Sequence, residues 1–385
     1  MQAQKNSSVP DKAIAAPVGF DLNLTRTLVP LKDMSESHLL ALLENAVAEV
    51  VCAGQTLFSA GSYDGQHVYL LHGDVALVDA EGVRTQIKGR STLFPITHQQ
   101  PRTCTAVAET DCSVLRIDSE QLDKMLTWSQ VADYLQLIIS RERDLDEDMD
   151  WMMVILRSNL FFKVSPLNVE QIFSRLTPQV VYAGDVIIRQ GELGDHCYFI
   201  KEGEADVTRH TDRNKREHLA TIGVGRCVGE DALVNETVRN ATVMMRTDGV
   251  LMRLEKQDFY RLLKEPSVAT LSLADLTQEL AKGLVAVDVR SEEEYSEAHL
   301  PQAVNIPLNI LSIKSRLLSK DKLYVFYCDT GRRSRAAAHL LTQHGYRALA
   351  LDNCAQLFSP MSAQQFLTDT HNYVLRNGEV IPGQN

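Results

Sequence analysis

The strongest constraint on how this 385-residue chain folds is an internal repeat in its first two thirds. Residues 35–76 align without a gap with residues 165–206, and seven aligned positions carry the same residue. Self-similarity at a fixed spacing indicates that one folding unit has been duplicated. Glycines dominate the shared positions, and they mark tight turns between short elements. The shared pairs are Ser35/Ser165, Val50/Val180, Val51/Val181, Ala53/Ala183, Gly54/Gly184, Gly61/Gly191 and Gly73/Gly203.

Short, β-rich segments follow the opening of each repeat. In the second repeat they include residues 186–188 and 205–208, separated by turns that contain glycine. Before them, Ser35 and Ser165 stand where each could cap a short amphipathic helix, and Pro166 would occupy the first helical position. Brief strands between tight turns are typical of an antiparallel sandwich or jelly roll. The repeat therefore predicts two β jelly-roll domains with flanking helices.

A long helix is expected between the two repeats. Apolar residues recur at helical spacing from Val131 to Met153, around a charged stretch at residues 141–150. Carboxylates in this stretch could in principle hold a cation, but carboxylates spread around a helix are typical of a solvated face, which we expect here. The acidic residues are Asp144, Asp146, Glu147, Asp148 and Asp150.

Charge and composition exclude several classes of protein. The formal net charge of -11 repels polyphosphate and no basic patch compensates, so we expect no binding to DNA or other nucleic acids. The longest apolar runs fall far short of the roughly 20 residues that span a bilayer, and the first 30 residues lack a secretory apolar core. The seven cysteines are scattered and never spaced Cys-x-x-Cys, which indicates neither a disulfide framework nor a zinc site. We expect a cytoplasmic protein without membrane insertion or a metal cofactor.

A phosphate-binding pattern follows the glycine turns of the second repeat. The first free N–H groups of a helix bind anions. A carboxylate beside them can accept a ribose hydroxyl, and an arginine can pair with a phosphate oxygen. The residues in this pattern are Gly229, Glu230, Asp231, Ala232, Arg239, Asn240 and Ala241.

This segment resembles the phosphate-binding cassette of cyclic nucleotide-binding domains, and the resemblance covers residues 160–262. It implies that Glu230 accepts the ribose 2'-hydroxyl and that Arg239 pairs with an exocyclic phosphate oxygen. The default ligand is cAMP, with cGMP or another ligand left open. The chain departs from the family at Asn240, and at Pro266, which truncates the usual lid helix. The alternative is that Glu230 and Arg239 merely pair with each other across a loop.

The first repeat has lost half of this pattern. Leu93 and Phe94 align with Gly229 and Glu230, so no carboxylate is available for a ribose. Arg102 remains, which leaves weak anion binding open. We expect this degenerate repeat to serve in docking or dimerisation.

The last third of the chain alternates between strands and helices, which predicts an open α/β sheet. A strand at residues 323–327 ends directly before Cys328, and ligands of such sheets bind at the carboxyl ends of the strands. A helix N-terminus, converging N–H groups and neighbouring arginines all lower the pKa of a thiol. The loop residues after Cys328 are Asp329, Thr330, Gly331, Arg332, Arg333 and Ser334.

The loop, with the segments around Asp288-Val289-Arg290, Glu294-Tyr295 and His299-Leu300-Pro301, resembles the rhodanese superfamily over residues 268–360. The resemblance implies a six-residue cradle in which Cys328 carries a persulfide from a sulfur donor such as thiosulfate to a thiol, cyanide or protein acceptor. Related phosphatases need Cys-x5-Arg, whereas position 334 is serine, so the loop favours sulfur over phosphate. We expect Asp288 and Arg290 to be structural. Cys354 either resolves a persulfide or packs, and packing is the expectation.

The sequence as a whole predicts a cyclic nucleotide sensor coupled to a rhodanese-type sulfurtransferase. The first alternative is a non-enzymatic, cAMP-responsive signalling adaptor whose rhodanese-like domain is a docking module, and the second is a sulfur carrier with structural repeats. Partners would be a homodimer copy or a signalling protein. The expected parts are a flexible N-terminus at 1–28, a degenerate domain at 29–128, a helical linker at 129–158, the intact sensor at 159–265, the rhodanese-like domain at 268–363 and a C-terminal tail at 364–385.

Overall fold

The computed structural model of the protein describes residues 21–89, 92–142, 151–152, 166–211, 215–358, 365–376 and 378–383. The chain divides into two compact units, Met1–Leu126 and Thr127–Asn385. The acidic stretch at residues 144–150 lies outside the described residues, as does most of the segment expected to be a flexible N-terminus. Within the described ranges, no helix is both long enough and apolar enough to cross a membrane.

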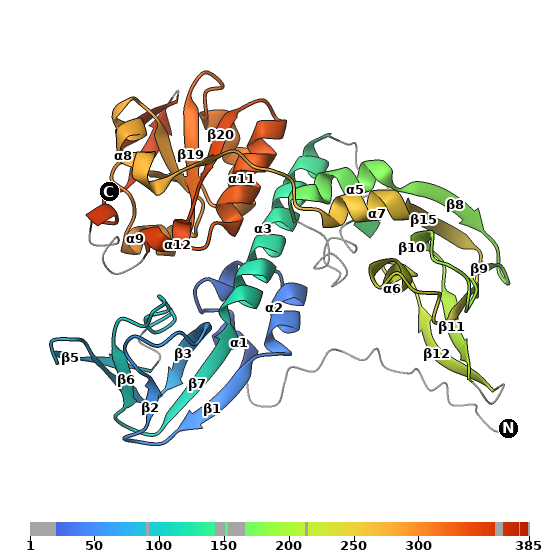
Figure 1. Cartoon of the computed structure of the whole chain (residues 1–385), viewed down its shortest axis with the longest axis horizontal. Coiled ribbons are helices and arrows are strands. Elements are labelled where there is room, and N and C mark those ends of the chain that lie inside the picture. Colours follow the sequence, from blue (N-terminus) through green and yellow to red (C-terminus); the bar gives the residue numbers. More distant parts are fainter. Residues whose placement is uncertain are drawn as a thin grey trace, which may run out of the picture. The chain divides into compact units, whose positions relative to one another are not determined.

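The first unit is a sandwich of two antiparallel sheets (Figure 1). Helices α1 (Leu22–Thr25) and α2 (Glu36–Leu43) precede the sheets, with a short 3-10 turn between them. One sheet has the order β1-β7-β3, with β1 at Val47–Val51, β7 at Cys112–Asp118 and β3 at Gln66–His72. The other has the order β2-β6-β4-β5, with β2 at Thr56–Phe58, β6 at Thr105–Ala108, β4 at Asp74–Val78 and β5 at Arg84–Lys88. The long helix α3 (Ser119–Glu142) follows in the sequence, as the apolar spacing predicts.

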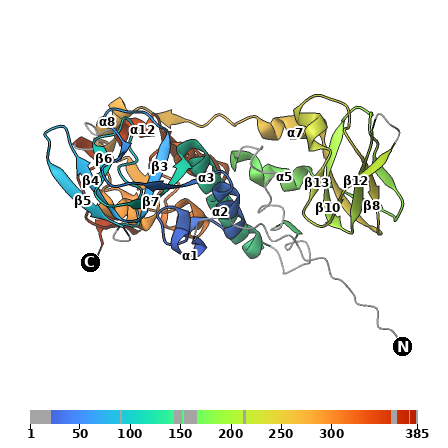
Figure 2. The same ribbon diagram turned by 90° about the horizontal axis from the view of Figure 1, so that it is seen from below.

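The second repeat, in the second unit, has the same pair of sheets. The order β13-β10-β15-β8 comprises Cys227–Val228, His196–Glu202, Gly249–Glu255 and Thr177–Val181. The order β12-β11-β14-β9 comprises Arg216–Ile222, Ala205–His210, Thr242–Met245 and Val186–Ile188. Helices α5 (Val169–Arg175) and α7 (Lys256–Leu263) lie side by side at one end of this sandwich (Figures 1 and 2). The prediction of two jelly-roll domains with flanking helices is confirmed.

The shared residues of the repeat explain why both copies fold alike. Val51 and Val181 are buried whereas Val50 and Val180 are exposed, which is the period of two that a half-buried strand requires. All six repeated turn glycines have a positive φ, a conformation that favours glycine. One detail differs from the expectation, because Pro166 opens a 3-10 turn, η3 (Pro166–Asn168), and the α-helix begins only at Val169.

The last part of the second unit is a five-stranded parallel sheet with helices packed on it (Figure 1). Its order β16-β20-β19-β17-β18 comprises Thr270–Leu271, Arg347–Leu351, Leu323–Tyr327, Val285–Asp288 and Val304–Asn305. The helices are α8 (Leu273–Ala281), α9 (Glu292–Glu297), α10 (Leu311–Lys314), α11 (Arg332–Gln343) and α12 (Cys354–Leu357). This confirms the prediction of an α/β domain with a parallel sheet.

The residues expected to form a C-terminal tail contain an antiparallel hairpin. Strands β21 (Tyr373–Arg376) and β22 (Glu379–Pro382) pair with each other, and β21 contacts β18. The Leu375 side chain is buried in the apolar core of the unit. The end of the chain therefore contributes to the fold of the α/β domain.

Candidate functional site

In the second repeat, a glycine in a left-handed conformation joins β13 to α6 (Glu230–Val234). Gly229 has φ +89°, and a Cβ at this position would lie 2.5 Å from Nη1 of Arg239. Any side chain here would therefore be strained by the backbone and would displace the arginine. The N-cap residue of α6 is Gly229, which has no side chain to accept a hydrogen bond from the first N–H groups of the helix.

Arg239 is almost fully buried against this turn. Its Nη1 donates a hydrogen bond of 2.7 Å to the carbonyl oxygen of Gly229, and its Nη2 donates one of 2.5 Å to the carbonyl oxygen of His196. Arg239 also forms an ion pair with Asp195, whose Oδ1 lies 3.7 Å from Nη2. The guanidinium thus fixes the cassette loop to β10 while its charge has only a distant carboxylate partner.

One hollow brings the predicted residues together. All seven of the residues proposed from the sequence line a single pocket of about 190 Å³. Apolar side chains of the sheet β12-β11-β14-β9, among them Ile188, Val207 and Ile222, form a further part of its wall. A few polar groups in an otherwise apolar concave wall are typical of small-molecule sites. The lining residues from the cassette are Gly229, Glu230, Asp231, Ala232, Arg239, Asn240 and Ala241.

In the first repeat, the arginine that corresponds to Arg239 has different hydrogen-bond partners. Arg102 is buried and bound by the carboxylate of Asp64, with Nη2 2.8 Å from Oδ1 and Nε 3.1 Å from Oδ2. Its other donors reach the carbonyl oxygens of Thr97 and Gln66, and its guanidinium lies 4.1 Å above the ring of Phe58. An anion binding here would have to break a buried ion pair, which is costly.

The repeat alignment identifies what replaces Asp64 in the second copy. The equivalent position is Gly194, where a Cβ would lie 3.4 Å from Cζ of Arg239. The first repeat therefore supplies an internal carboxylate to its arginine, and the second has none at the same place.

In the α/β domain, Cys328 follows β19 directly and precedes α11. Its sulfur accepts a hydrogen bond of 3.0 Å from the backbone N–H of Gly331, which has φ +98°. The side chain of Cys328 is fully buried. The tight turn at Gly331 aims an N–H group back at the sulfur, as an anion-binding turn does.

The surroundings of Cys328 favour its thiolate. Burial opposes the charge, but a hydrogen bond from the Cys354 thiol and the positive charge of Arg333 outweigh it and lower the pKa of Cys328 to about 6. The same hydrogen bond and burial raise the pKa of Cys354. The surroundings therefore favour ionisation of Cys328 over that of Cys354.

Arg333 holds the loop through ion pairs, and Arg290 forms a separate ion pair in the same domain. Arg333 binds both carboxylate oxygens of Glu294 at 2.9 Å and also Oδ1 of Asp329 at 2.8 Å. Arg290 binds Asp288 at 2.7 Å within the buried interior, in keeping with the structural role expected for both. Arg333 therefore acts on Cys328 through its charge, because its guanidinium donates its hydrogen bonds to the carboxylates of Glu294 and Asp329.

Two models of known families match the chain. The family model described as the cyclic nucleotide-binding domain matches residues 48–127 and 178–265, and the model of the rhodanese-like domain matches residues 272–354. The chain carries two cyclic nucleotide-binding domains followed by a rhodanese-like domain. The cassette and the Cys328 loop each lie within the matched ranges.

Two of the similar curated proteins are named as cAMP-dependent protein kinase regulatory subunits. The chain is 26% identical over 234 residues to a cAMP-dependent protein kinase regulatory subunit of Yarrowia lipolytica, covering 60% of this chain and 58% of that protein. It is 40% identical over 94 residues to the regulatory subunit of Schizosaccharomyces pombe, covering 24% of this chain and 22% of that protein. The chain thus spans less than two thirds of the length of these curated relatives.

Solved structures of similar proteins include the regulatory subunit of a cAMP-independent protein kinase A from Trypanosoma cruzi bound to guanosine. It is 15% identical, with a TM-score of 0.27, over 62% of this chain and 81% of that one.

Sequence reasoning missed three features of the sites. Asp64 carried no signal, because its partner Arg102 is 38 residues away in the chain. Glu294 lies in one of the motifs that resemble the rhodanese superfamily, but no role was predicted for it. Its position in the capping box of α9 is the one local signal that could have identified it. The contact of Cys354 with Cys328 was weighed but not expected.

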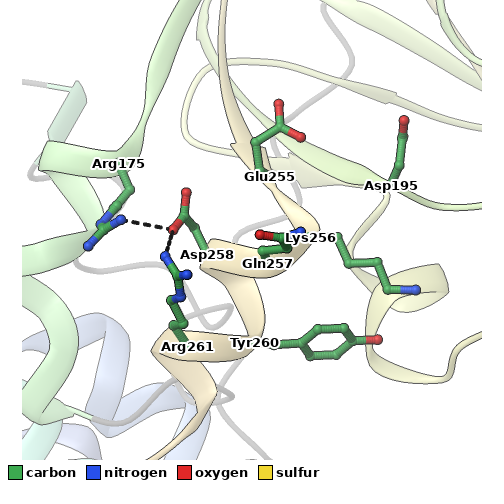
Figure 3. Close-up of a pocket in the computed structure, with 8 residues that line it drawn as sticks. All are labelled: Arg175, Asp195, Glu255, Lys256, Gln257, Asp258, Tyr260 and Arg261. Atoms are coloured by element: carbon green, nitrogen blue, oxygen red, sulfur yellow. Dashed lines mark hydrogen bonds and ion pairs between the residues drawn. The ribbon is translucent and has the colours of Figure 1, made fainter.

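A larger hollow lies elsewhere on the second cyclic nucleotide-binding domain (Figure 3). It measures about 720 Å³, and charged side chains dominate its wall. In Figure 3 the carboxylate of Asp258 lies between the guanidinium groups of Arg175 and Arg261, at 3.0 and 3.3 Å. Tyr260, on the same wall, donates a hydrogen bond of 2.9 Å to the carbonyl oxygen of Leu233 at the end of α6. This hollow is distinct from the cassette pocket. Tyr260 of α7 lines the hollow and is bonded to α6, and the first residues of α6 line the cassette pocket.

Proposed function

We propose that the protein is a cyclic nucleotide sensor coupled to a sulfurtransferase. The observation that carries the enzymatic part is the buried Cys328 sulfur, which receives the Gly331 N–H group and has a pKa of about 6. A thiolate held by converging donors is a sulfur nucleophile at neutral pH.

The sulfur-transfer chemistry is as follows. The Cys328 thiolate attacks the outer sulfur of thiosulfate, an S–S bond forms at Cys328, and sulfite leaves with the electrons of the broken S–S bond. A thiol, cyanide or a protein acceptor then takes the outer sulfur and regenerates the thiolate. Gly331 stabilises the charge that returns to Cys328. The short loop, with Ser334 in place of a phosphatase arginine, supports sulfur as the cargo.

The sensor part rests on the cassette pocket of the second repeat. Glu230 would accept the ribose 2'-hydroxyl, and the N–H groups at the start of α6 would face the cyclic phosphate. Arg239 has five donors, so it can pair with a phosphate oxygen while keeping a bond to the loop. The preferred ligand is cAMP, in keeping with relatives named as cAMP-dependent regulatory subunits. The cytoplasm remains the proposed location.

Contacts within the second unit support coupling between the two sites. Tyr260 ties α7 to the end of α6, and Asn168 donates hydrogen bonds of 2.8 Å to the carbonyl oxygens of Leu262 and Lys264 at the end of α7. The turn η3, which contains Asn168, contacts α11, the helix that begins in the Cys328 loop. A nucleotide that shifts α6 would change this chain of contacts, which is the requirement for coupling two sites.

Thiosulfate turnover tests both parts. The wild type and Cys328→Ala are each assayed with and without cAMP, and Cys52→Ala, which changes an exposed cysteine, is the matched control. We expect loss of turnover in Cys328→Ala alone and a rate that depends on cAMP in the wild type. Unchanged turnover in Cys328→Ala would rule out the nucleophile, and equal wild-type rates with and without cAMP would rule out the coupling.

The second candidate function is the non-enzymatic signalling adaptor. The full burial of Cys328 favours it, because a sulfur donor must reach an atom that solvent does not. Calorimetry with cAMP would then lose its signal in Arg239→Ala but not in Arg246→Ala, an exposed arginine of the same domain. Intact mass after incubation with thiosulfate would show no added sulfur. Added sulfur on Cys328 would exclude the adaptor as the sole function.

A further inference from the structure

A second thiol lies against the proposed nucleophile. Cys354 is the first residue of α12, which follows β20, the strand adjacent to β19 in the sheet. Its side chain is 1% exposed, its thiol donates a hydrogen bond of 3.1 Å to the carbonyl oxygen of Leu351, and its presence lowers the pKa of the Cys328 thiol. The two cysteines are brought together by the pairing of neighbouring parallel strands, since both follow the carboxyl ends of those strands.

Ser334 completes this buried group. Its Oγ lies 3.7 Å from the sulfur of Cys328 and 3.7 Å from that of Cys354, and it donates to the carbonyl oxygen of Gly331 at 3.0 Å. A Cβ placed on Gly331 would lie 3.9 Å from Cβ of Cys354, so the loop passes directly over the second cysteine. The Cys354 thiol and the Ser334 hydroxyl therefore lie beside the Cys328 sulfur, which would be the inner sulfur of any persulfide formed there.

We propose that Cys354 is a catalytic resolving thiol, which attacks the inner sulfur of the Cys328 persulfide and releases hydrogen sulfide. This rests on the proposed function, because it requires the persulfide. The S–S bond of the persulfide breaks, and a Cys328–Cys354 disulfide forms. The outer sulfur leaves with the bonding electrons and takes the proton of Cys354. The two cysteine sulfurs are oxidised, and the outer sulfur is reduced to sulfide.

The charges around the pair fit this order of events. The thiolate of Cys328 and burial keep the pKa of Cys354 raised, so Cys354 stays protonated while Cys328 attacks the donor. Once the persulfide forms, its negative charge is carried by the outer sulfur, one bond farther from Cys354. The obstacle to deprotonating Cys354 is then smaller, and its sulfur lies 3.7 Å from the same Ser334 Oγ that lies 3.7 Å from the sulfur of Cys328.

The step defines the class of acceptor. Resetting the enzyme requires two thiol groups, which reduce the disulfide and are oxidised to a disulfide themselves. The acceptor would therefore be a dithiol reductant, and the product would be hydrogen sulfide in place of a persulfidated acceptor.

A single-turnover experiment tests the step. The reduced full-length protein is incubated anaerobically with thiosulfate and no other thiol, and sulfite, sulfide and intact mass are followed. The wild type should release one equivalent each of sulfite and sulfide and lose the mass of two hydrogen atoms. Cys354→Ser should release the same sulfite, no sulfide, and retain the mass of one added sulfur atom. Peptide mapping of the wild type should find Cys328 linked to Cys354.

The outcomes separate this inference from the proposed function. A wild type that releases sulfite but keeps the added sulfur overturns the resolving role and leaves sulfur transfer standing. A wild type that releases no sulfite overturns sulfur transfer and the resolving role with it. The mapping on the wild type decides the matter if Cys354→Ser does not fold, and Cys52→Ser, an exposed cysteine, should behave as the wild type does.

Discussion

The contrast between Arg102 and Arg239 leads to a sharp prediction about ligand binding. Gly194→Asp should transfer the internal carboxylate of the first repeat to the second, because a Cβ at Gly194 would lie 3.4 Å from both Cζ and Nη1 of Arg239. The new carboxylate would then compete with the phosphate of the nucleotide for the same guanidinium. Ala232 stands 3.0 Å from that Cβ and must shift slightly.

The expected loss of cAMP affinity follows from the strength of the hydrogen bonds between Arg239 and the phosphate. Hydrogen bonds to a charged group contribute about 1.5–3 kcal/mol each. Losing one of them to the internal carboxylate should weaken cAMP binding about ten- to 150-fold. The uncharged Gly194→Asn has nearly the same shape, so it measures the steric part alone and should weaken binding much less.

Isothermal titration calorimetry with cAMP measures all of these proteins. The first arm compares the wild type, Gly194→Asp and Gly194→Asn, and Arg239→Ala gives the limit in which the arginine is absent. In the Arg239→Ala background, adding Gly194→Asp should have little further effect, because its target is gone. Equal losses for the aspartate and asparagine variants would refute the reasoning, since charge would then have no part in the effect.

Three further predictions concern Asp64 in the first repeat, the thiolate of Cys328 and the effect of Cys354 on that thiolate. Asp64→Ala should destabilise the first unit by about 3 kcal/mol, measured by hydrogen exchange of its strands, because it leaves the buried Arg102 without its carboxylate; exchange rates equal to those of the wild type would contradict this. The rate of persulfide formation with thiosulfate should rise as the pH passes about 6 and level off above it, because the thiolate is the form that attacks. In Cys354→Ala the midpoint should move to higher pH, since the hydrogen bond that favours the thiolate is lost, and an unchanged midpoint would show that Cys354 does not act on Cys328.

The three domains could be predicted from local patterns along the chain. Turn glycines such as Gly184 and alternating valines such as Val181 are local signals, because the backbone conformation at one residue and the period of two in a strand are both properties of a short stretch of chain. The Cys328 loop was equally local, since its spacing, its glycine and the following helix lie within seven residues. These features could be predicted without knowing what lies nearby in space.

Which charges and thiols lie in contact became clear only from the folded chain. Asp64 reaches Arg102 across 38 positions, Glu294 reaches Arg333 across 39, and Cys354 meets Cys328 because β20 pairs with β19. Such contacts depend on strand order and side-chain packing, which leave no periodic trace in the sequence. For this reason the repeat alignment could find both arginines, but only the folded chain distinguishes the one that holds its own carboxylate from the one that faces an open pocket.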